Sequence, residues 1–194
     1  MGEAWSRTVH LLVFNGLADW EIGLVAYELN TRVGMPVVTI GFTTESARSG
    51  GGLRIVPDVA LRSVDPATIS LLILPGGAMW QTLDNEPLRS LIRALRGRDV
   101  PIAAICGATT FLARMGLLDD VTHTSNSLDY LAEAAPGYIG RDAYVDQPAA
   151  RDEGIITAGG DASAEFAYEI LAELRAYNGV QLEEFAQFWR CRSP

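Results

Sequence analysis

Cys106 stands at the junction between a predicted strand and a predicted helix. The strand, Pro101–Ile105, carries no charge, and small residues follow it in the stretch IAAICGATTFLARMG. A thiol at such a turn lies at the rim of the sheet, where N–H groups of the first helical turn are free to donate. The positive end of the helix favours the thiolate, so the pattern predicts a lowered pKa for Cys106 and a nucleophilic role. A cysteine that is only a small buried core residue fits the local pattern equally well.

A second uncharged strand runs into a pair of glycines. Ser70–Leu74 is followed by Gly76 and Gly77 in the stretch LLILPGGAMW. If the two strands are neighbours, the N–H groups of Gly77 and Gly107 converge beside the sulfur. Two such donors form an oxyanion hole, which stabilises the negative oxygen that develops when a nucleophile attacks a carbonyl. The alternative is that these glycines only form a turn.

The elements that must position these residues alternate along the chain. Strands are predicted at Val9–Phe14, Pro36–Phe42, Ser70–Leu74, Pro101–Ile105 and Ile155–Ala158, with a short strand near Val121 and a hairpin around Ala47–Arg54. Helices are predicted at Asp19–Val33, Glu86–Arg98, Gly107–Met115, Leu128–Ala135 and Ala162–Tyr177. Uncharged strands between amphipathic helices are typical of a mainly parallel sheet with helices on both faces.

The loops after parallel strands gather at one edge of the sheet, where sites lie in such folds. Asp19, Trp20 and Glu21 follow the first strand and are therefore expected at the same edge as Gly76 and Cys106. Asp19 is the predicted N-cap of the first helix, and Gly34 is its predicted C-terminal stop.

The composition limits the class of protein. The 194 residues, 48% of them hydrophobic, suffice for one domain with a sizeable core, and the segment VQLEEFAQFWR predicts a C-terminal helical extension from about residue 179. A net charge of −9 without a basic cluster argues against nucleic acid or an anionic membrane surface as a partner. No apolar run is long enough to span a bilayer and no secretory pattern opens the chain, so a cytoplasmic location is expected.

Cysteine and glycine usage argues against cofactors. The two cysteines, Cys106 and Cys191, lie far apart in unlike surroundings, so a disulfide framework is not expected. With two histidines and two cysteines in unrelated contexts, no metal-ligand spacing is present. The glycine-rich stretches match neither a P-loop nor a dinucleotide fingerprint, and no cofactor is expected.

Three stretches together resemble a known family. LILPGGAMW, IAAICGATTFLARMGLL and the acidic residue in GLADWEIGL are similar to the motifs of the ThiJ/PfpI family, part of the class I glutamine-amidotransferase-like superfamily, and the late segment GIITAGGDASAEFAYEILAEL extends the resemblance over nearly the whole chain. It implies a flavodoxin-like three-layer α/β sandwich, a homodimer, and a reactive Cys106 paired with Glu21. Held beside the sulfur, Glu21 is expected to have a raised pKa and to act as a hydrogen-bond donor and proton shuttle. Alternatively, Glu21 only complements its own helix N-terminus.

The sequence departs from the family pattern at a histidine. Several family members carry one shortly after the cysteine-bearing helix, but alignment places His123 one position early and Thr124 at the expected place. Two interpretations follow: a different turn brings His123 to the sulfur, or Thr124, Ser125 or Asn126 replaces it as a neutral partner. No histidine follows His123, so the later His-x-Glu pair of the glutamine-amidotransferase branch is absent.

Two tryptophans flank the candidate residues in sequence. Trp20 and Trp80 are expected to wall an apolar pocket mouth, unless they are ordinary core or dimer-interface aromatics. These features predict a cysteine-dependent enzyme that acts on a small carbonyl or amide substrate, as an amidase or peptidase-like hydrolase or as a glyoxalase-like enzyme. The alternatives are a redox-responsive or chaperone-like stress protein that uses the same cysteine, and a non-catalytic binding module.

Overall fold

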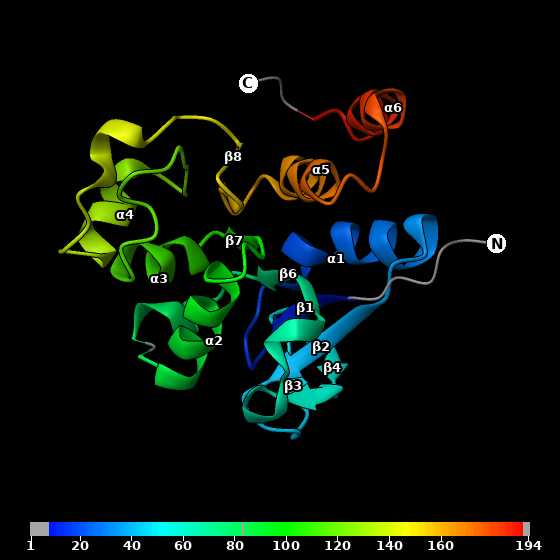
Figure 1. The fold of residues 1–194 in the computed structure, drawn as a ribbon, viewed down its shortest axis with the longest axis horizontal. Helices are drawn as coiled ribbons and strands as arrows, with labels where there is room; N and C mark the ends of the chain where they lie inside the picture. The colour runs from blue at the N-terminus through cyan, green and yellow to red at the C-terminus, as the bar shows by residue number, and fades with distance from the viewer. Residues whose placement is uncertain (1–7, 83, 192–194) are drawn as a thin grey trace.

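The computed structural model describes residues 8–82 and 84–191. Its centre is a seven-stranded sheet in the order β5-β2-β1-β6-β7-β9-β8 (Figure 1). The strands are β1 (Thr8–Val13), β2 (Val37–Gly41), β5 (Val59–Ala60), β6 (Ile69–Leu74), β7 (Ile102–Ile105), β8 (Ala149–Asp152) and β9 (Ile155–Ala158). All neighbouring pairs are parallel except β8 and β9. Strands β6 and β7 lie at the centre of the sheet. They carry no charge because helices cover both of their faces.

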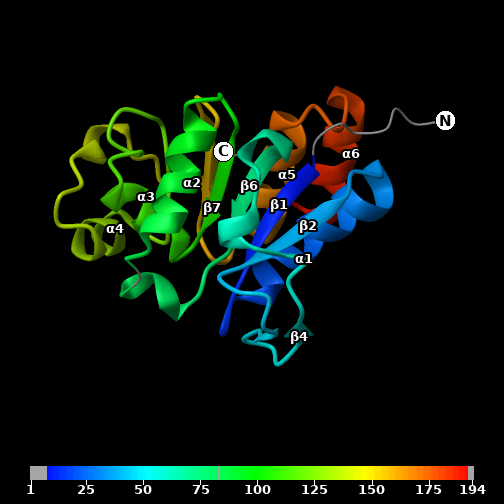
Figure 2. The ribbon, with the colours of Figure 1, turned by 60° about the horizontal axis from the view of Figure 1, so that its bottom comes forward.

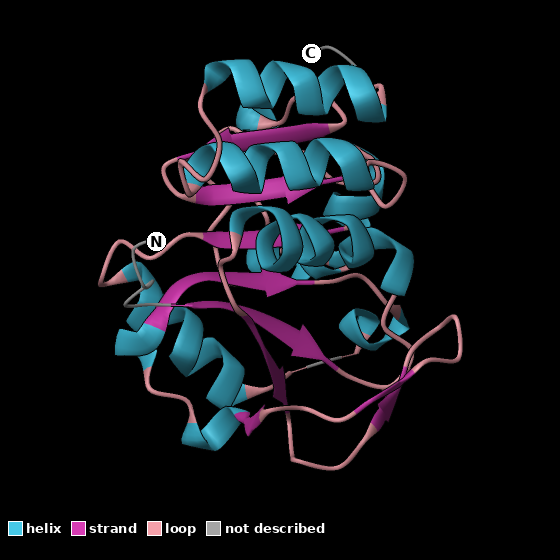
Figure 3. Ribbon diagram, turned by 90° about the vertical axis from the view of Figure 1, so that its right-hand side faces the viewer, coloured by secondary structure: helices cyan, strands magenta, loops and turns pink. Residues whose placement is uncertain are grey.

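Helices cover both faces of this sheet. On one face, α1 (Asp19–Tyr27) packs against α5 (Ser163–Glu173), and α6 (Gly179–Trp189) lies outside α5 (Figures 1 and 2). The opposite face carries α2 (Glu86–Arg96) and α3 (Ala108–Arg114), with α4 (Leu128–Ala134) beside α3. Figure 3 shows the strands stacked between the helices. The predicted flavodoxin-like α/β sandwich is confirmed.

Short elements complete the chain. The helical turns are η1 (Glu28–Val33), η2 (Leu61–Ser63), η3 (Pro66–Thr68), η4 (Ala78–Gln81) and η5 (Gly140–Ala143). The first of these continues α1 with π-helical geometry and ends at Gly34, whose φ of 74° is left-handed as the predicted stop requires. Throughout residues 8–82 and 84–191, no helix has the length and apolar character needed to cross a membrane.

Two predictions about local structure are wrong. The N-cap of α1 is Ala18, which makes no side-chain capping bond, and Asp19 is the first helical residue. No regular strand forms near Val121, where only an isolated bridge joins His123 to Tyr144. The sequence analysis also missed β5 and β8. The first has only two residues, and the second is an edge strand that contains Arg151 and Asp152, so neither shows the uncharged run used to find the others.

The predicted hairpin supplies the hydrogen-bond partners of the Asp19 side chain. Strands β3 (Ala47–Arg48) and β4 (Arg54–Ile55) pair antiparallel and form a separate two-stranded sheet. The Asp19 carboxylate accepts hydrogen bonds from the Ser49 hydroxyl and from the Gly51 N–H, the latter at 3.0 Å. The side chain that was expected to cap the helix therefore holds the hairpin against the start of α1.

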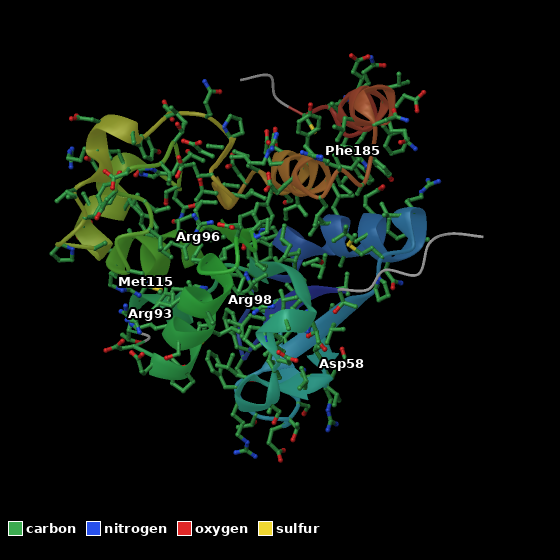
Figure 4. All side chains as sticks on the ribbon, in the orientation of Figure 1. Asp58, Arg93, Arg96, Arg98, Met115 and Phe185 are labelled. Carbon is green, nitrogen blue, oxygen red and sulfur yellow. The ribbon has the colours of Figure 1, made fainter. Side chains whose placement is uncertain are left out.

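A final helix forms from Gly179. Asn178 and Gln181 make reciprocal hydrogen bonds of a capping box at its start. Phe185, labelled in Figure 4, is buried on the side of α6 that faces α5. Phe188 on the same helix is 76% exposed. This helix therefore packs on the sandwich through a narrow apolar stripe.

Candidate active site

Cys106 occupies a strained turn between β7 and α3. Its φ is +57°, in the left-handed region that residues other than glycine seldom adopt. The turn is held by the Cys106 N–H, which donates to the Ala158 carbonyl at 2.9 Å, and by the Thr109 hydroxyl, which donates to the Cys106 carbonyl at 2.6 Å. The Gly107 N–H acts to lower the pKa of the thiol, although burial raises it more. A strand, one left-handed residue and a helix thus form the strand-to-helix junction predicted at Cys106.

Glycines bring the backbone close around the sulfur. A Cβ at Gly76 would lie 2.5 Å from Glu21 Oε2 and 2.8 Å from Cys106 Cβ. A Cβ at Gly160 would lie 2.9 Å from Cys106 Sγ. Gly77 has a φ of +150°, and a Cβ there would lie 2.8 Å from the Phe14 ring. Each of these positions therefore requires glycine, for reasons of space or of backbone conformation.

Glu21 lies beside the sulfur and is completely buried. Its Oε2 accepts a hydrogen bond of 2.6 Å from the Gly76 N–H, while Oε1 has no hydrogen-bond partner among the described residues. Burial raises the pKa of Glu21, and the hydrogen bonds from Gly76 and Cys106 lower it less. A proton on Oε1 gives this atom the O–H that can donate to the sulfur.

The thiol pKa differs from the sequence prediction. Burial raises the pKa of Cys106 and a negative charge on Glu21 raises it further, whereas hydrogen bonds from Asn126 and the Gly107 N–H lower it. The helix N-terminus acts in the predicted direction, but loss of hydration is the larger effect. Because the two acids are adjacent, they compete for one proton and titrate as a pair. Burial therefore disfavours a negative charge on either group, and a charge on Glu21 raises the pKa of the thiol further.

Asn126 is the side-chain amide that contacts the sulfur. Its Nδ2 donates to Cys106 Sγ at 3.4 Å, and its Oδ1 accepts from the Gly160 N–H at 2.9 Å. Because a backbone N–H can only donate, the amide oxygen of Asn126 must face Gly160 and its NH2 group must face the sulfur. Of the two interpretations of this segment, the neutral partner at Asn126 is the one that the geometry supports.

His123 and Thr124 have other partners. The His123 ring is fully buried, with Nδ1 2.7 Å from the Val121 carbonyl and Nε2 2.6 Å from the Tyr138 hydroxyl. Burial lowers the pKa of His123, so the ring is neutral near pH 7. The Thr124 hydroxyl donates to the Gln147 carbonyl at 2.8 Å. The hypothesis that His123 pairs with Cys106 is therefore wrong, because both ring nitrogens are engaged elsewhere.

The two tryptophans have different environments. Trp80 is fully buried, and its Nε1 donates to the Pro75 carbonyl at 2.7 Å. Its ring packs beneath Gly107, whose Cβ would lie 3.2 Å from Trp80 Cδ1, so it is a core aromatic and not part of a pocket mouth. Trp20 is 63% exposed and its Nε1 donates to the Gly160 carbonyl at 3.3 Å. Only Trp20 stands at the rim of the site.

Two residues at the site were missed by the sequence analysis. Gly160 packs against the sulfur, and the strand-then-glycines pattern at Ile155–Gly160 repeats the pattern that drew attention to Gly76. Tyr130 was missed because it lies in a helix, outside the loops that follow the strands. Burial raises the pKa of the Tyr130 hydroxyl, and the charges of Cys106 and Glu21 raise it further, so the phenol lies within range of their charges.

A large groove on the described part of the chain lies away from Cys106. A groove of about 890 Å³ between α1 and α6 is lined by Leu24, Tyr27, Phe185 and Phe188 among others. Its lining does not include Cys106, Glu21 or Asn126. The candidate site is therefore identified by the chemistry of its side chains and not by the size of a cavity. Among the described residues, no three His, Cys, Asp or Glu side chains form a group that could hold a metal ion.

Comparisons with known proteins identify related chains. The family model described as the DJ-1/PfpI family matches residues 7–173. The Bacillus subtilis protein named uncharacterized protease YoaZ is 36% identical over 196 residues, which cover 97% of this chain and 93% of the relative. The Caenorhabditis elegans protein named glutathione-independent glyoxalase DJR-1.2 is 32% identical over 154 residues, 78% of this chain and 80% of the relative. The crystal structure of a DJ-1 superfamily protein from Agrobacterium tumefaciens matches with a TM-score of 0.85 at 34% identity, covering 95% of this chain and 100% of that one.

Proposed function

Because the chain belongs to the DJ-1/PfpI family, we propose that it is a cysteine-dependent enzyme that acts on small carbonyl compounds, with Cys106 as nucleophile and Glu21 as proton shuttle. The observation that carries the proposal is the buried Glu21 carboxyl, held by the Gly76 N–H with its other oxygen left to the sulfur. A buried acid at a strained cysteine turn is costly for folding and is the arrangement that proton transfer at sulfur needs.

The chemistry begins with addition of sulfur to an aldehyde carbon. The C–S bond forms, and the electron pair of the C=O π bond moves to oxygen. The N–H groups of Gly77 and Gly107 hold this oxyanion until Glu21 gives it a proton. The resulting carboxylate of Glu21 then accepts a proton from carbon or oxygen in the next step. Glu21 thus both donates and accepts a proton, and no imidazole is needed.

The contact of a neutral amide, Asn126, with the sulfur, in place of a histidine, favours aldehydes over amides as substrates. Amide hydrolysis must protonate an amine as it leaves, which a histidine does in Cys–His enzymes. Here the corresponding contact to sulfur comes from an amide that does not titrate near neutral pH. Addition to an aldehyde expels no amine, so Glu21 alone is enough. The amidase or peptidase-like alternative is retained as a second candidate, since one relative is named as a protease and another as a glyoxalase.

Methylglyoxal turnover tests this proposal. The intact protein is expected to consume methylglyoxal, and Cys106→Ala is expected to abolish the activity. Glu21→Gln should lower kcat by about 100-fold or more, because the amide keeps the shape but cannot shuttle a proton. Cys191→Ala is the matched control and should retain full activity. Equal turnover by the Cys106→Ala variant and the intact protein would contradict the proposal.

The surroundings of the sulfur also suit an oxidised cysteine. The Asn126 amide, the Gly107 N–H and a protonated Glu21 could each donate to the oxygens of a sulfinic acid, which favours the redox-responsive alternative. Mass spectrometry after mild peroxide should then show two added oxygens at Cys106 and not at Cys191. Equal modification of both cysteines would count against it. A thiol without selective peroxide reactivity and without turnover would leave the non-catalytic binding module.

The same resemblance extends the proposal to assembly and location. The protein is proposed to act as a homodimer in the cytoplasm on a small-molecule substrate, without nucleic acid or membrane partners. The net charge of −9 supports the exclusion of anionic partners. Light scattering of the purified protein at several concentrations is expected to give twice the 20.9 kDa chain mass, and a mass equal to one chain would contradict the dimer.

A further inference from the structure

Ser125 carries a buried hydroxyl next to the residue that contacts the sulfur. The segment from His123 to Asn126 forms neither a helix nor a regular strand, and Ser125 within it is only 5% exposed. On sequence grounds, Ser125 is one of the neutral residues expected to replace a histidine at Cys106. Its hydroxyl contacts Thr109 instead, with 2.7 Å between the two hydroxyl oxygens. The proposed chemistry gives this buried contact no role.

The number of protons on the two hydroxyls determines which one donates. Thr109 lies in the first turn of α3 and is fully buried, and its hydroxyl donates to the Cys106 carbonyl at 2.6 Å. A threonine hydroxyl carries one proton, so Thr109 must accept in its contact with Ser125. The Ser125 hydroxyl is therefore the donor. A chain of two hydrogen bonds thus runs from Ser125 through Thr109 to the backbone of the cysteine turn.

This chain of hydrogen bonds ends on the strained residue of the turn. Cys106 has a φ of +57°, and a residue other than glycine keeps such a conformation only where its surroundings hold it. The Cys106 carbonyl accepts from the Thr109 N–H, at 3.1 Å, as well as from the Thr109 hydroxyl. Each donor in a chain of hydrogen bonds polarises the next, so the bond from Ser125 strengthens the hold on this carbonyl.

The other end of the chain lies next to an exposed amide. Asn126 is exposed, and its Nδ2 lies 3.4 Å from Cys106 Sγ. An exposed side chain keeps such a contact only if its rotamer freedom is restricted. The Gly160 N–H holds the amide oxygen at 2.9 Å, and the backbone that carries Asn126 is held by the buried Ser125. These two fixed points define where the amide lies relative to the sulfur.

We propose that Ser125 is a positioning residue of the site: through Thr109, its hydroxyl holds the cysteine turn and the neighbouring Asn126 at a fixed separation, so that the amide donates to the sulfur. Ser125 acts through Asn126 and is not itself a catalytic residue. No bond is made or broken at its hydroxyl, which keeps its proton throughout. For its effect on turnover, this inference rests on the proposed function.

Alkylation of Cys106 by iodoacetamide across a pH series tests this role without requiring turnover. Ser125→Ala is expected to slow alkylation at neutral pH about three- to fivefold, the loss typical of one hydrogen bond, and to move the inflection against pH upward. Because Ser125 acts through Asn126, the double variant Ser125→Ala/Asn126→Ala should react within about 1.5-fold of Asn126→Ala alone. Effects that multiply in the double variant, or an unchanged rate in Ser125→Ala, would overturn the proposal.

Ser127→Ala is the matched control, because it truncates the serine on the other side of Asn126. The Ser127 hydroxyl accepts from the Tyr130 N–H at 3.1 Å and caps α4, so its loss weakens that helix and not the cysteine turn. The alkylation rate of this variant should stay within about 1.5-fold of that of the intact protein. Equal slowing in Ser127→Ala and Ser125→Ala would indicate a general loosening of the segment and overturn the proposal.

A second pair of variants decides the question if Ser125→Ala does not fold, which circular dichroism shows. Thr109→Ser keeps the bridging hydroxyl and should keep the alkylation rate, whereas Thr109→Val removes the hydroxyl and should slow alkylation at least as much as Asn126→Ala. Equal rates in these two variants would overturn the proposal. Methylglyoxal turnover separates the two proposals: if the intact protein does not consume methylglyoxal, the proposed function fails, while the alkylation rates still decide the role of Ser125.

Discussion

At the scale of single residues, the site is a buried acid beside a half-buried thiol, and burial raises the pKa of both groups. The Glu21 carboxyl has one oxygen satisfied by backbone and the other left to sulfur. Hydrogen bonds from Asn126 and Gly107 compensate part of the hydration that Cys106 loses by burial. Asn126 donates to the sulfur but, as a neutral amide, cannot accept a proton from the thiol. In the proposed mechanism, proton transfer is therefore the role of the Glu21 carboxyl group.

Asn126→Ala is expected to raise the thiol pKa, because it removes a donor that lowers it. The inflection of Cys106 alkylation against pH should move upward, and the alkylation rate at neutral pH should fall about three- to tenfold. Iodoacetamide labelling across a pH series measures both quantities. The control is Asn30→Ala, which truncates an exposed amide in η1. An inflection that stays in place or moves downward would contradict the role given to this amide.

At the scale of elements, four loops meet because four strands are neighbours. The turn after β7 holds Cys106, and the turns after β6 and β9 bring Gly76 and Gly160 against it from either side. The loop after β1 leads into α1 and Glu21. The hairpin of β3 and β4 braces this loop, since the Gly50 N–H donates to the Leu17 carbonyl at 2.7 Å. Each loop therefore positions one part of the site.

Gly160→Ala is expected to be destabilising and to slow alkylation of Cys106. The new Cβ would lie 2.9 Å from Sγ and 3.2 Å from Glu21 Oε1, so the sulfur must move. Overpacking of this kind costs about 1–3 kcal/mol of unfolding free energy, which urea titration can measure. Gly137→Ala is the matched control, because nothing lies within 4 Å of its Cβ. If the two variants were equally stable and equally reactive, the close packing at Gly160 would be disproved.

Asp19→Asn is expected to loosen the hairpin without unfolding the sandwich. The hydrogen bonds from Ser49 and Gly51 hold the pKa of Asp19 below its usual value. The carboxylate therefore contributes stability above that usual value, and this contribution is lost as pH falls through the lowered pKa. The amide hydrogens of Gly51 and Leu53, compared through protection factors so that the pH dependence of the intrinsic exchange rates cancels, should be less protected in the variant, and their protection should also decrease in the intact protein under acid. Asp120→Asn, at an exposed position, should leave both protection factors unchanged.

At the scale of the whole molecule, the sandwich buries titratable groups whose charged forms it disfavours. His10 and His123 both lie in the interior, and burial lowers the pKa of each. Between the lowered folded value and the ordinary value near 6.5, the unfolded chain binds more protons than the folded one. Stability from these two groups is therefore present at neutral pH and decreases as the solution is acidified. The buried Glu21, with its raised pKa, acts in the opposite direction.

The midpoint temperature of thermal unfolding is expected to decrease as the pH is lowered from 7 to 5. His123→Gln should lower the midpoint at pH 7, because the contact with Tyr138 is weakened, but should show a smaller further decrease on acidification. Thermal scans of both proteins across this pH range compare the two slopes. Equal slopes would show that the buried ring does not contribute to the acid sensitivity.

The sequence by itself determined the fold class and the tight turn at which Cys106 lies. Uncharged strands such as Ser70–Leu74 can be recognised in the sequence, because burial on both faces of the sheet excludes charged residues from the strand. Cys106 is readable because a residue between a strand and a helix must lie at the sheet edge. Asp19 was misassigned for a related reason: residue type and local position suit a cap, but a hairpin about 30 residues away uses the carboxylate.

Only the tertiary structure decided which side chains face the sulfur. The choice between His123 and Asn126 depends on how an irregular segment turns beside Thr157 and Gly160, neither of which is near it in sequence. The direction of the thiol pKa depends on burial by neighbouring loops, which outweighs the local helix N-terminus. Gly160 and Tyr130 become site residues through strand order and helix packing. Local periodicity encodes the elements, whereas distances between segments far apart in sequence follow only from how those elements pack.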